Sequence, residues 1–117
     1  MCTPKTIRPD QLPATIRAYL AAHAAGEADA AIRAFAPDAL VVDDGRSYRG
    51  TAEVLAFLRG AGAEFDYTTE LVGAERIDAA HWVALQRLEG DFPGGVVDLR
   101  YRFTLADDLV SELVIAP

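Results

Sequence analysis

Two adjacent carboxylates, Asp43 and Asp44, close a short apolar run and are well placed for acid–base chemistry. The run covers residues 39–42, and Gly45 turns the chain directly after the acids. If the run is a buried strand, one carboxylate lies at its inner end, where a ligand would be met. A carboxylate in an apolar, partly dehydrated site can abstract a proton next to a carbonyl group. The alternative is that both acids only start the turn, since Asp is favoured in turns.

A second group with chemical potential lies on the first predicted helix, which Asp10 or Pro13 begins and Gly26 ends. Its apolar face is formed by residues at i, i+4, i+7, i+8 and i+11, namely Leu12, Ile16, Tyr19, Leu20 and His23. Tyr19 and His23 therefore face the same way. A buried phenol can donate a hydrogen bond to developing negative charge, and an imidazole can act as general acid or base. The alternatives are a core tyrosine and a satisfied histidine near the helix end.

Further helices and one hairpin must position these groups. A second helix opens at Glu27, buries Phe35 on its stripe and ends at Pro37. The strand at 39–43 and a return segment at 47–49 form a hairpin around Gly45. Thr51 is expected to cap a third helix that packs four apolar side chains inward: Val54, Leu55, Phe57 and Leu58.

From residue 65 onward, apolar residues recur about every 2 positions instead of about every 3.6, which predicts strands. The expected strands are 66–77, with a bulge at Gly73, and then 81–89, 96–105 and 109–115. In the third of these, Leu99, Tyr101 and Phe103 alternate with charged side chains. The result is an α+β fold with three N-terminal helices covering one face of a mostly antiparallel sheet, as a single domain over 1–117.

Composition restricts the partners. The formal charge is −7 and Lys5 is the only lysine, so we expect no nucleic acid partner. Cys2 is the one cysteine, and no apolar segment is long enough to cross a membrane, which favours a cytoplasmic protein. We expect no metal, because His23, His81 and Asp43 lie on three distant elements without ligand spacing. We expect no cofactor, because the sequence has no glycine-rich phosphate loop and no dinucleotide fingerprint.

The order of elements and the junction residues resemble the nuclear transport factor 2-like superfamily, and within it the SnoaL-like and ketosteroid isomerase-like branches. The residues that carry this resemblance are Ala25-Gly26-Glu27-Ala28-Asp29, Phe35-Ala36-Pro37-Asp38, Val41-Val42-Asp43, Tyr48-Arg49-Gly50-Thr51 and Arg102-Phe103-Thr104-Leu105. The resemblance implies a cone-shaped fold, a curved sheet around an apolar pocket, and a homodimer formed through the outer sheet face.

The resemblance also implies roles for individual residues. Asp43 falls where ketosteroid isomerases hold the carboxylate that moves a proton, and Tyr19 falls where they hold a tyrosine that hydrogen-bonds the substrate oxyanion. Those isomerases place a protonated acid on the strand at 96–105, and this chain has Leu99 there. An oxyanion hole with two donors would then lack one of them, and losing a donor typically costs about 10²–10³ in rate.

Aromatic and apolar side chains could line the pocket or simply form the core. The expected ligand-binding residues are Phe57, Trp82, Leu99, Tyr101 and Phe103. The leading hypothesis is a protein that binds a small apolar molecule, with cofactor-free isomerase or cyclase chemistry by proton abstraction next to a carbonyl. In it, Asp43 is the base, Tyr19 the donor, and His23 a further acid–base group.

Two other hypotheses remain open. One is a non-catalytic ligand-binding or dimeric interaction module with structural carboxylates. The other is epoxide-hydrolase-like activation of water by Asp98 and Arg100 with Asp66. Strand alternation, however, predicts that Asp98, Arg100 and Arg102 point outward, opposite to Leu99.

Overall fold

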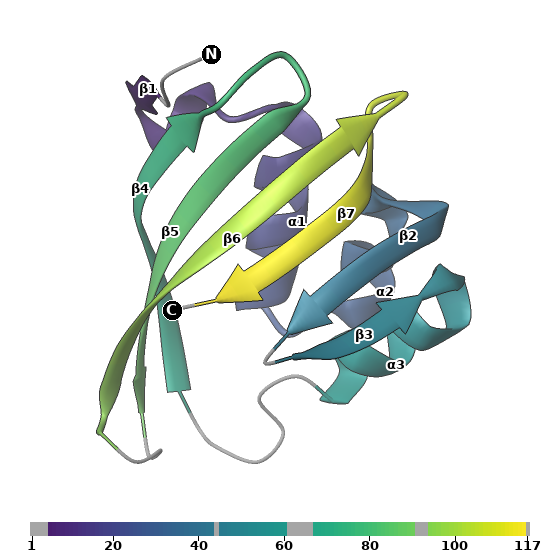
Figure 1. The fold of residues 1–117 in the computed structure, drawn as a ribbon. Coiled ribbons are helices and arrows are strands. Elements are labelled where there is room, and N and C mark those ends of the chain that lie inside the picture. The colour runs from purple at the N-terminus through teal and green to yellow at the C-terminus, as the bar shows by residue number, and fades with distance from the viewer. Residues whose placement is uncertain (1–4, 44, 61–66, 91–93, 117) are drawn as a thin grey trace.

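The computed structural model describes residues 5–43, 45–60, 67–90 and 94–116. Its helices are α1 (Ala14–Ala24), α2 (Ala28–Ala31) and α3 (Gly50–Gly60). Its strands are β1 (Lys5–Ile7), β2 (Phe35–Asp43), β3 (Arg46–Arg49), β4 (Tyr67–Arg76), β5 (His81–Gly90), β6 (Val96–Ala106) and β7 (Leu109–Ala116). All three helices lie behind the sheet in Figure 1, so the sheet has a helix-covered inner face and an outer face.

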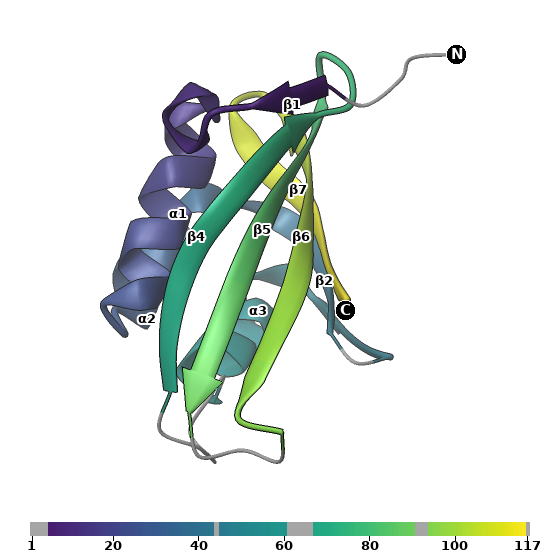
Figure 2. The same ribbon diagram turned by 90° about the vertical axis from the view of Figure 1, so that its left-hand side faces the viewer.

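The strands form one seven-stranded sheet in the order β1-β4-β5-β6-β7-β2-β3, and this sheet does not close into a barrel. Every neighbouring pair is antiparallel except β2 and β7, which run parallel. The α+β class and the mostly antiparallel sheet are therefore as predicted. Figure 2 shows the long strands bending around the helices.

Helix α1 buries the face that its apolar spacing predicts, including Ile16, Tyr19 and Leu20. Its N-cap is Pro13, whereas Asp10 lies in a preceding 3-10 turn, Pro9–Gln11. Pro suits a helix start because it needs no hydrogen bond from its own nitrogen. Gly26 follows the helix with a φ of +72°, a conformation that glycine adopts without strain.

The second helix is shorter than predicted. α2 ends at Ala31 and a 3-10 turn covers Ile32–Ala34, so Phe35 already begins β2. Pro37 therefore lies inside a strand instead of ending a helix. β2 tolerates it because its register against β7 is interrupted between Phe35 and Leu40, where no ladder hydrogen bond is required from a proline.

Helix α3 begins two residues earlier than expected, at Gly50, so Thr51 lies inside its first turn instead of capping it. The carboxylate of Glu53 accepts a hydrogen bond of 2.9 Å from the backbone N–H of Arg49 and supplies the N-terminal contact. Val54, Phe57 and Leu58 are buried, as the apolar spacing predicts.

The meander follows its predicted pattern closely. The register of β4 against β5 shifts between Leu71 and Gly73, which confirms the bulge at the glycine. A Cβ at Gly73 would lie 3.1 Å from Leu85 Cδ1, so the close approach of these strands favours glycine. In β6, Tyr101 and Phe103 are buried on the inner face while Arg100 and Arg102 are exposed on the outer face.

Candidate functional site

An aromatic cluster on the inner face surrounds Tyr19, which is completely buried. The ring of His23 stacks on that of Tyr19, with centroids 5.7 Å apart. Phe35 and Phe103 meet the same ring edge-on at 5.3 Å and 5.6 Å. His23 also lies 6.2 Å from the ring of Tyr101. The structure thus brings together two of the three predicted catalytic residues, with Tyr19 in the core and His23 half-buried beside it.

His23 is uncharged at neutral pH. Burial lowers its pKa below the ordinary 6.5, because an imidazolium inside the core would lose its hydration. A neutral imidazole keeps one donor and one acceptor nitrogen. It can therefore accept or donate a hydrogen bond to a ligand without carrying a charge into the core.

Asp43 lies at the end of β2 and faces the same side of the sheet as the buried Val41. It borders an apolar pocket of about 420 Å³ in which it is the only charged lining residue among those described. The lining residues are Val42, Asp43, Gly45, Leu99, Val114, Ile115 and Ala116. The predicted ligand-binding residue Leu99 therefore shares a pocket with the predicted base.

Ile115 connects Asp43 with the aromatic cluster. It pairs with Asp43 on one side and with Tyr101 on the other, so the three residues form one row on the inner face. Because neighbouring strands lie about 4.8 Å apart, the Cα atoms of Asp43 and Tyr101 are separated by about 10 Å. Tyr19 and His23 are not among the described residues that line the Asp43 pocket.

The remaining predicted ligand-binding residues are core residues in the described part of the chain. Phe57 packs on Tyr48 at 4.9 Å between α3 and β3. Phe103 is fully buried, and Trp82, its partner on β5, packs against the core half-buried. These side chains shape the inner face.

Sequence reasoning missed Gln86, a polar residue that is only 3% exposed. It lies on β5 between Leu71 of β4 and Leu99 of β6, on the inner face. Strand alternation contained the signal, because Gln86 follows Trp82 and Ala84 at a period of two. A polar side chain at such a position is uncommon and requires a hydrogen-bond partner.

The charged row of β6 serves ion pairs on the outer face. Asp98 pairs with Arg87 at 2.9 Å, and Arg100 pairs with Glu75 at 2.9 Å. The hydrogen bond from Arg87 holds the pKa of the Asp98 carboxyl below its usual range. The proposed water-activating relay thus has two members on the face opposite Leu99, and its third member, Asp66, lies outside the described residues.

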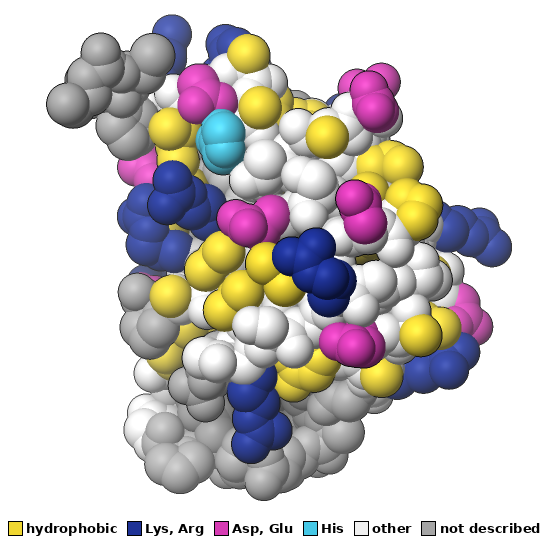
Figure 3. All heavy atoms as spheres, turned by 45° about the vertical axis from the view of Figure 1, so that its right-hand side comes forward, with side chains coloured by type: hydrophobic (Ala, Val, Ile, Leu, Met, Phe, Trp, Pro, Cys, Tyr) yellow, Lys and Arg dark blue, Asp and Glu magenta, His cyan; other side chains and the backbone are white. Residues whose placement is uncertain are grey.

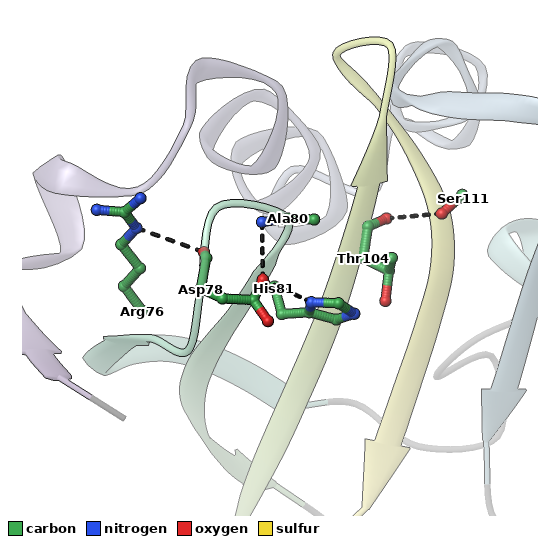
Figure 4. Close-up of polar contacts among 6 residues, drawn as sticks. All are labelled: Arg76, Asp78, Ala80, His81, Thr104 and Ser111. Carbon is green, nitrogen blue, oxygen red and sulfur yellow. Dashed lines mark hydrogen bonds and ion pairs between the residues drawn. The ribbon is translucent and has the colours of Figure 1, made fainter. Parts of the chain in front are cut away.

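His81, the second histidine, lies at the β4–β5 turn, far from His23. Its Nδ1 is 2.7 Å from the Asp78 carboxylate, which also accepts a hydrogen bond from the Ala80 backbone N–H (Figure 4). The hydrogen bond from His81 lowers the pKa of Asp78 most strongly. This pair stabilises the turn between the strands.

The described helices include none that is both long enough and apolar enough to span a membrane. No protein-family model and no curated protein sequence matches the chain.

Solved structures show what the chain is similar to. A candidate polyketide cyclase from Sinorhizobium meliloti superposes with a TM-score of 0.86 at 29% identity, over 94% of this chain and 100% of that chain. A Δ5-3-ketosteroid isomerase from a Mycobacterium species superposes with a TM-score of 0.70 at 18% identity, over 89% and 90%.

The chain has the nuclear transport factor 2-like fold. A further member of this fold, from Mycobacterium tuberculosis, is in complex with estradiol-17beta-hemisuccinate and superposes with a TM-score of 0.72 at 14% identity, over 88% of this chain and 90% of that chain. Within the NTF2-like fold of the present chain, β2 supplies Asp43 and α1 supplies Tyr19 and His23.

Proposed function

We propose that this NTF2-like chain binds a small apolar carbonyl compound and that Asp43 abstracts the proton next to the carbonyl. The observation that carries the proposal is the pocket at the end of β2, where one carboxylate stands among apolar side chains. Such a site positions a base beside the C–H bond of a bound ketone. No cofactor is required for this proton transfer.

In this proposal the enolate oxygen is held by a phenol hydroxyl from the aromatic cluster. Tyr19 is the residue assigned to that role. Neutral His23 stacks on its ring and so helps to hold the phenol in place. The α-carbon and the enolate oxygen of a ketone are only two bonds apart. The side chains of Asp43 and Tyr19 would therefore both have to reach the same end of the ligand, past Ile115 and Tyr101.

The second candidate function is binding of the same ligand class without catalysis. The observation in its favour is the packing of Tyr19, whose ring is enclosed by Phe35, Phe103 and His23. In that case Asp43 only orients the ligand at the pocket mouth. The proposal further takes the chain as one cone-shaped domain over 1–117 that forms a homodimer in the cytoplasm.

The test is exchange of the α-protons of 1-tetralone in deuterated water, followed by proton NMR with catalytic amounts of protein. We expect the wild-type chain to accelerate exchange and Asp43→Asn to slow it by about 10²-fold or more, since general-base catalysis contributes about 10²–10⁴. Asp38→Asn is the matched control, because Asp38 is an exposed acid on the same strand.

Three outcomes are distinguishable. Loss of exchange in Asp43→Asn with normal exchange in Asp38→Asn supports the base. An exchange rate that is equal in wild type and Asp43→Asn excludes Asp43 from that role. Binding of 1-tetralone without any acceleration of exchange favours the non-catalytic alternative.

A further inference from the structure

The side-chain amide of Gln86 lacks a hydrogen-bond acceptor, and Gln86 has no part in the chemistry proposed at Asp43. Its side chain is 3% exposed, and its Nε2 has no hydrogen-bond partner within the described part of the chain. A buried amide donor that has lost its water and gained no acceptor is rare in folded proteins. The position of this group therefore calls for an acceptor from outside the fold.

A hollow of about 360 Å³ lies against Gln86, between α1 and the strands β4 and β5. Figure 2 shows α1 running along the β4 side of the sheet. Two of its wall residues, Ala21 and Ala24, are one turn apart on α1, and their small side chains leave the space above the sheet unfilled. The volume is in the range of small-molecule sites.

The strands beside Gln86 offer its amide only hydrocarbon. Leu71 is its partner on β4 and Leu99 is its partner on β6, so apolar side chains flank it on both sides of the inner face. Gln86 lines the hollow beside these leucines, so the acceptor that we infer for Nε2 is a group inside the hollow, reached when the amide turns toward it.

The charged residues of the hollow are already engaged near its rim. Arg17 donates from Nε to the Leu12 carbonyl at 2.9 Å, and Asp10 is ion-paired with Arg8 at 3.2 Å. The other walls are mostly apolar, with Pro9, Leu20 and Leu71 among them. Because most of the walls are apolar, a neutral ligand would lose less hydration in this hollow than an ion.

We propose that this hollow is a second ligand subsite, separate from the Asp43 pocket, which takes a neutral apolar molecule through one carbonyl oxygen. The Gln86 amide donates its hydrogen bond to that oxygen. Leu20, Leu71 and the two alanines of α1 enclose the hydrocarbon part. The subsite does not depend on proton abstraction by Asp43.

The test compares 1-tetralone with tetralin, the hydrocarbon of the same ring skeleton that lacks the oxygen. The readout is the side-chain amide signal of Gln86 in ¹H–¹⁵N NMR spectra, assigned by its disappearance in Gln86→Met. We expect 1-tetralone to shift this signal in a saturable manner and tetralin to bind without the downfield shift of a hydrogen-bonded amide proton. Gln86→Met, which keeps the side-chain length, should weaken 1-tetralone binding about 2- to 10-fold and leave tetralin binding unchanged.

Filling the hollow gives an independent check. Ala24→Leu should weaken binding of both compounds, whereas Ala18→Leu, at an exposed α1 position outside the hollow, should weaken neither. Asp43→Asn should leave the Gln86 shift unchanged, so a failure of the proposed proton transfer does not affect this result.

Two results would overturn the subsite. One is an unperturbed Gln86 amide signal at saturating 1-tetralone, which would mean that solvent alone satisfies the donor. The other is equal binding of 1-tetralone to wild type, Gln86→Met and Ala24→Leu.

Discussion

The imidazole of His23 lies parallel to the phenol ring of Tyr19, with centroids 5.7 Å apart and ring planes inclined by 11°. Tyr19 is part of the helix face that packs on the sheet, and the half-buried His23 lies one turn further along α1. This contact couples the charge state of one residue to the packing of the other, because a protonated imidazole would have to be accommodated inside the aromatic cluster.

Stability should fall with acidification through His23. The pKa of His23 is lowered in the folded chain by burial, from an ordinary value of 6.5 that the unfolded chain retains. Below about pH 6.5 the unfolded chain therefore binds a proton that the folded chain does not, down to the folded pKa. We expect the free energy of unfolding, from urea denaturation between pH 7 and 5, to fall by up to about 1.4 kcal/mol per pH unit from this residue.

His23→Phe is the matching control, because it keeps an aromatic ring and removes the titration. Its stability should depend less on pH over the same interval. Asp78, whose pKa is lowered by its hydrogen bond from His81, contributes only as the pH falls below about 3.8, outside this window. An unchanged slope in His23→Phe would assign the pH dependence to other groups.

Removing the hydroxyl of Tyr19 separates catalysis from packing. Tyr19→Phe keeps the edge contacts with Phe35 and Phe103, so the free energy of unfolding should fall by no more than about 1.5 kcal/mol. If Tyr19 donates to the enolate, α-proton exchange of 1-tetralone should slow by about 10²-fold. An exchange rate equal to that of wild type would make Tyr19 a core residue only.

The outer face of the sheet should form the homodimer contact. Val42 and Val114 are partners in the parallel pair of β2 and β7 and lie partly exposed on this face, where they also border the Asp43 pocket. Figure 3 shows apolar side chains there, mixed with acidic and basic ones. We expect a dimer mass for wild type by size exclusion with light scattering, and a monomer mass for Val114→Arg.

Ala18→Arg, with the same charge on the exposed side of α1, should remain dimeric. A monomer mass for wild type at high protein concentration would contradict the predicted outer-face dimer.

The β6–β7 turn should accept a stabilising substitution. Asp107 and Asp108 both have positive φ values, 54° and 63°, which is the geometry of a type I′ turn. Asp108→Gly relieves this strain and keeps the backbone carbonyl that accepts a hydrogen bond from the Thr15 hydroxyl at 2.7 Å. We expect a gain of about 0.5–1 kcal/mol in the free energy of unfolding.

Gly45→Ala is the opposite case, since Gly45 has a φ of +77° and alanine there is strained. It should lower the melting temperature while Asp108→Gly raises it. A loss of stability in Asp108→Gly would show that the aspartate side chain stabilises the turn.

The features that the sequence predicted correctly depend on the spacing of residues close together in the chain. The alternation of Leu99, Tyr101 and Phe103 with charged residues assigned the two faces of β6 correctly, and the spacing of Ile16, Tyr19 and Leu20 assigned the face of α1. These predictions succeeded because side-chain direction in a helix or strand depends only on the local backbone period.

The errors arose where tertiary contacts override local preference. Phe35 and Pro37 read as the end of a helix, yet pairing with β7 draws this segment into β2. Gln86 was missed because strand alternation marks it only as inward-facing, whereas its burial depends on α1 lying over β5.

The sequence by itself determined the α+β order, the faces of α1 and β6, the bulge at Gly73 and the presence of an acid at the end of an apolar strand. Only the tertiary structure decided that Ile115 stands between Asp43 and Tyr101, and that Asp43 shares its pocket with Leu99. The parallel pairing of β2 with the last strand joins segments that are distant in the chain. Such a pairing depends on how all the elements pack together to bury the core. The local spacing of apolar residues therefore does not predict it.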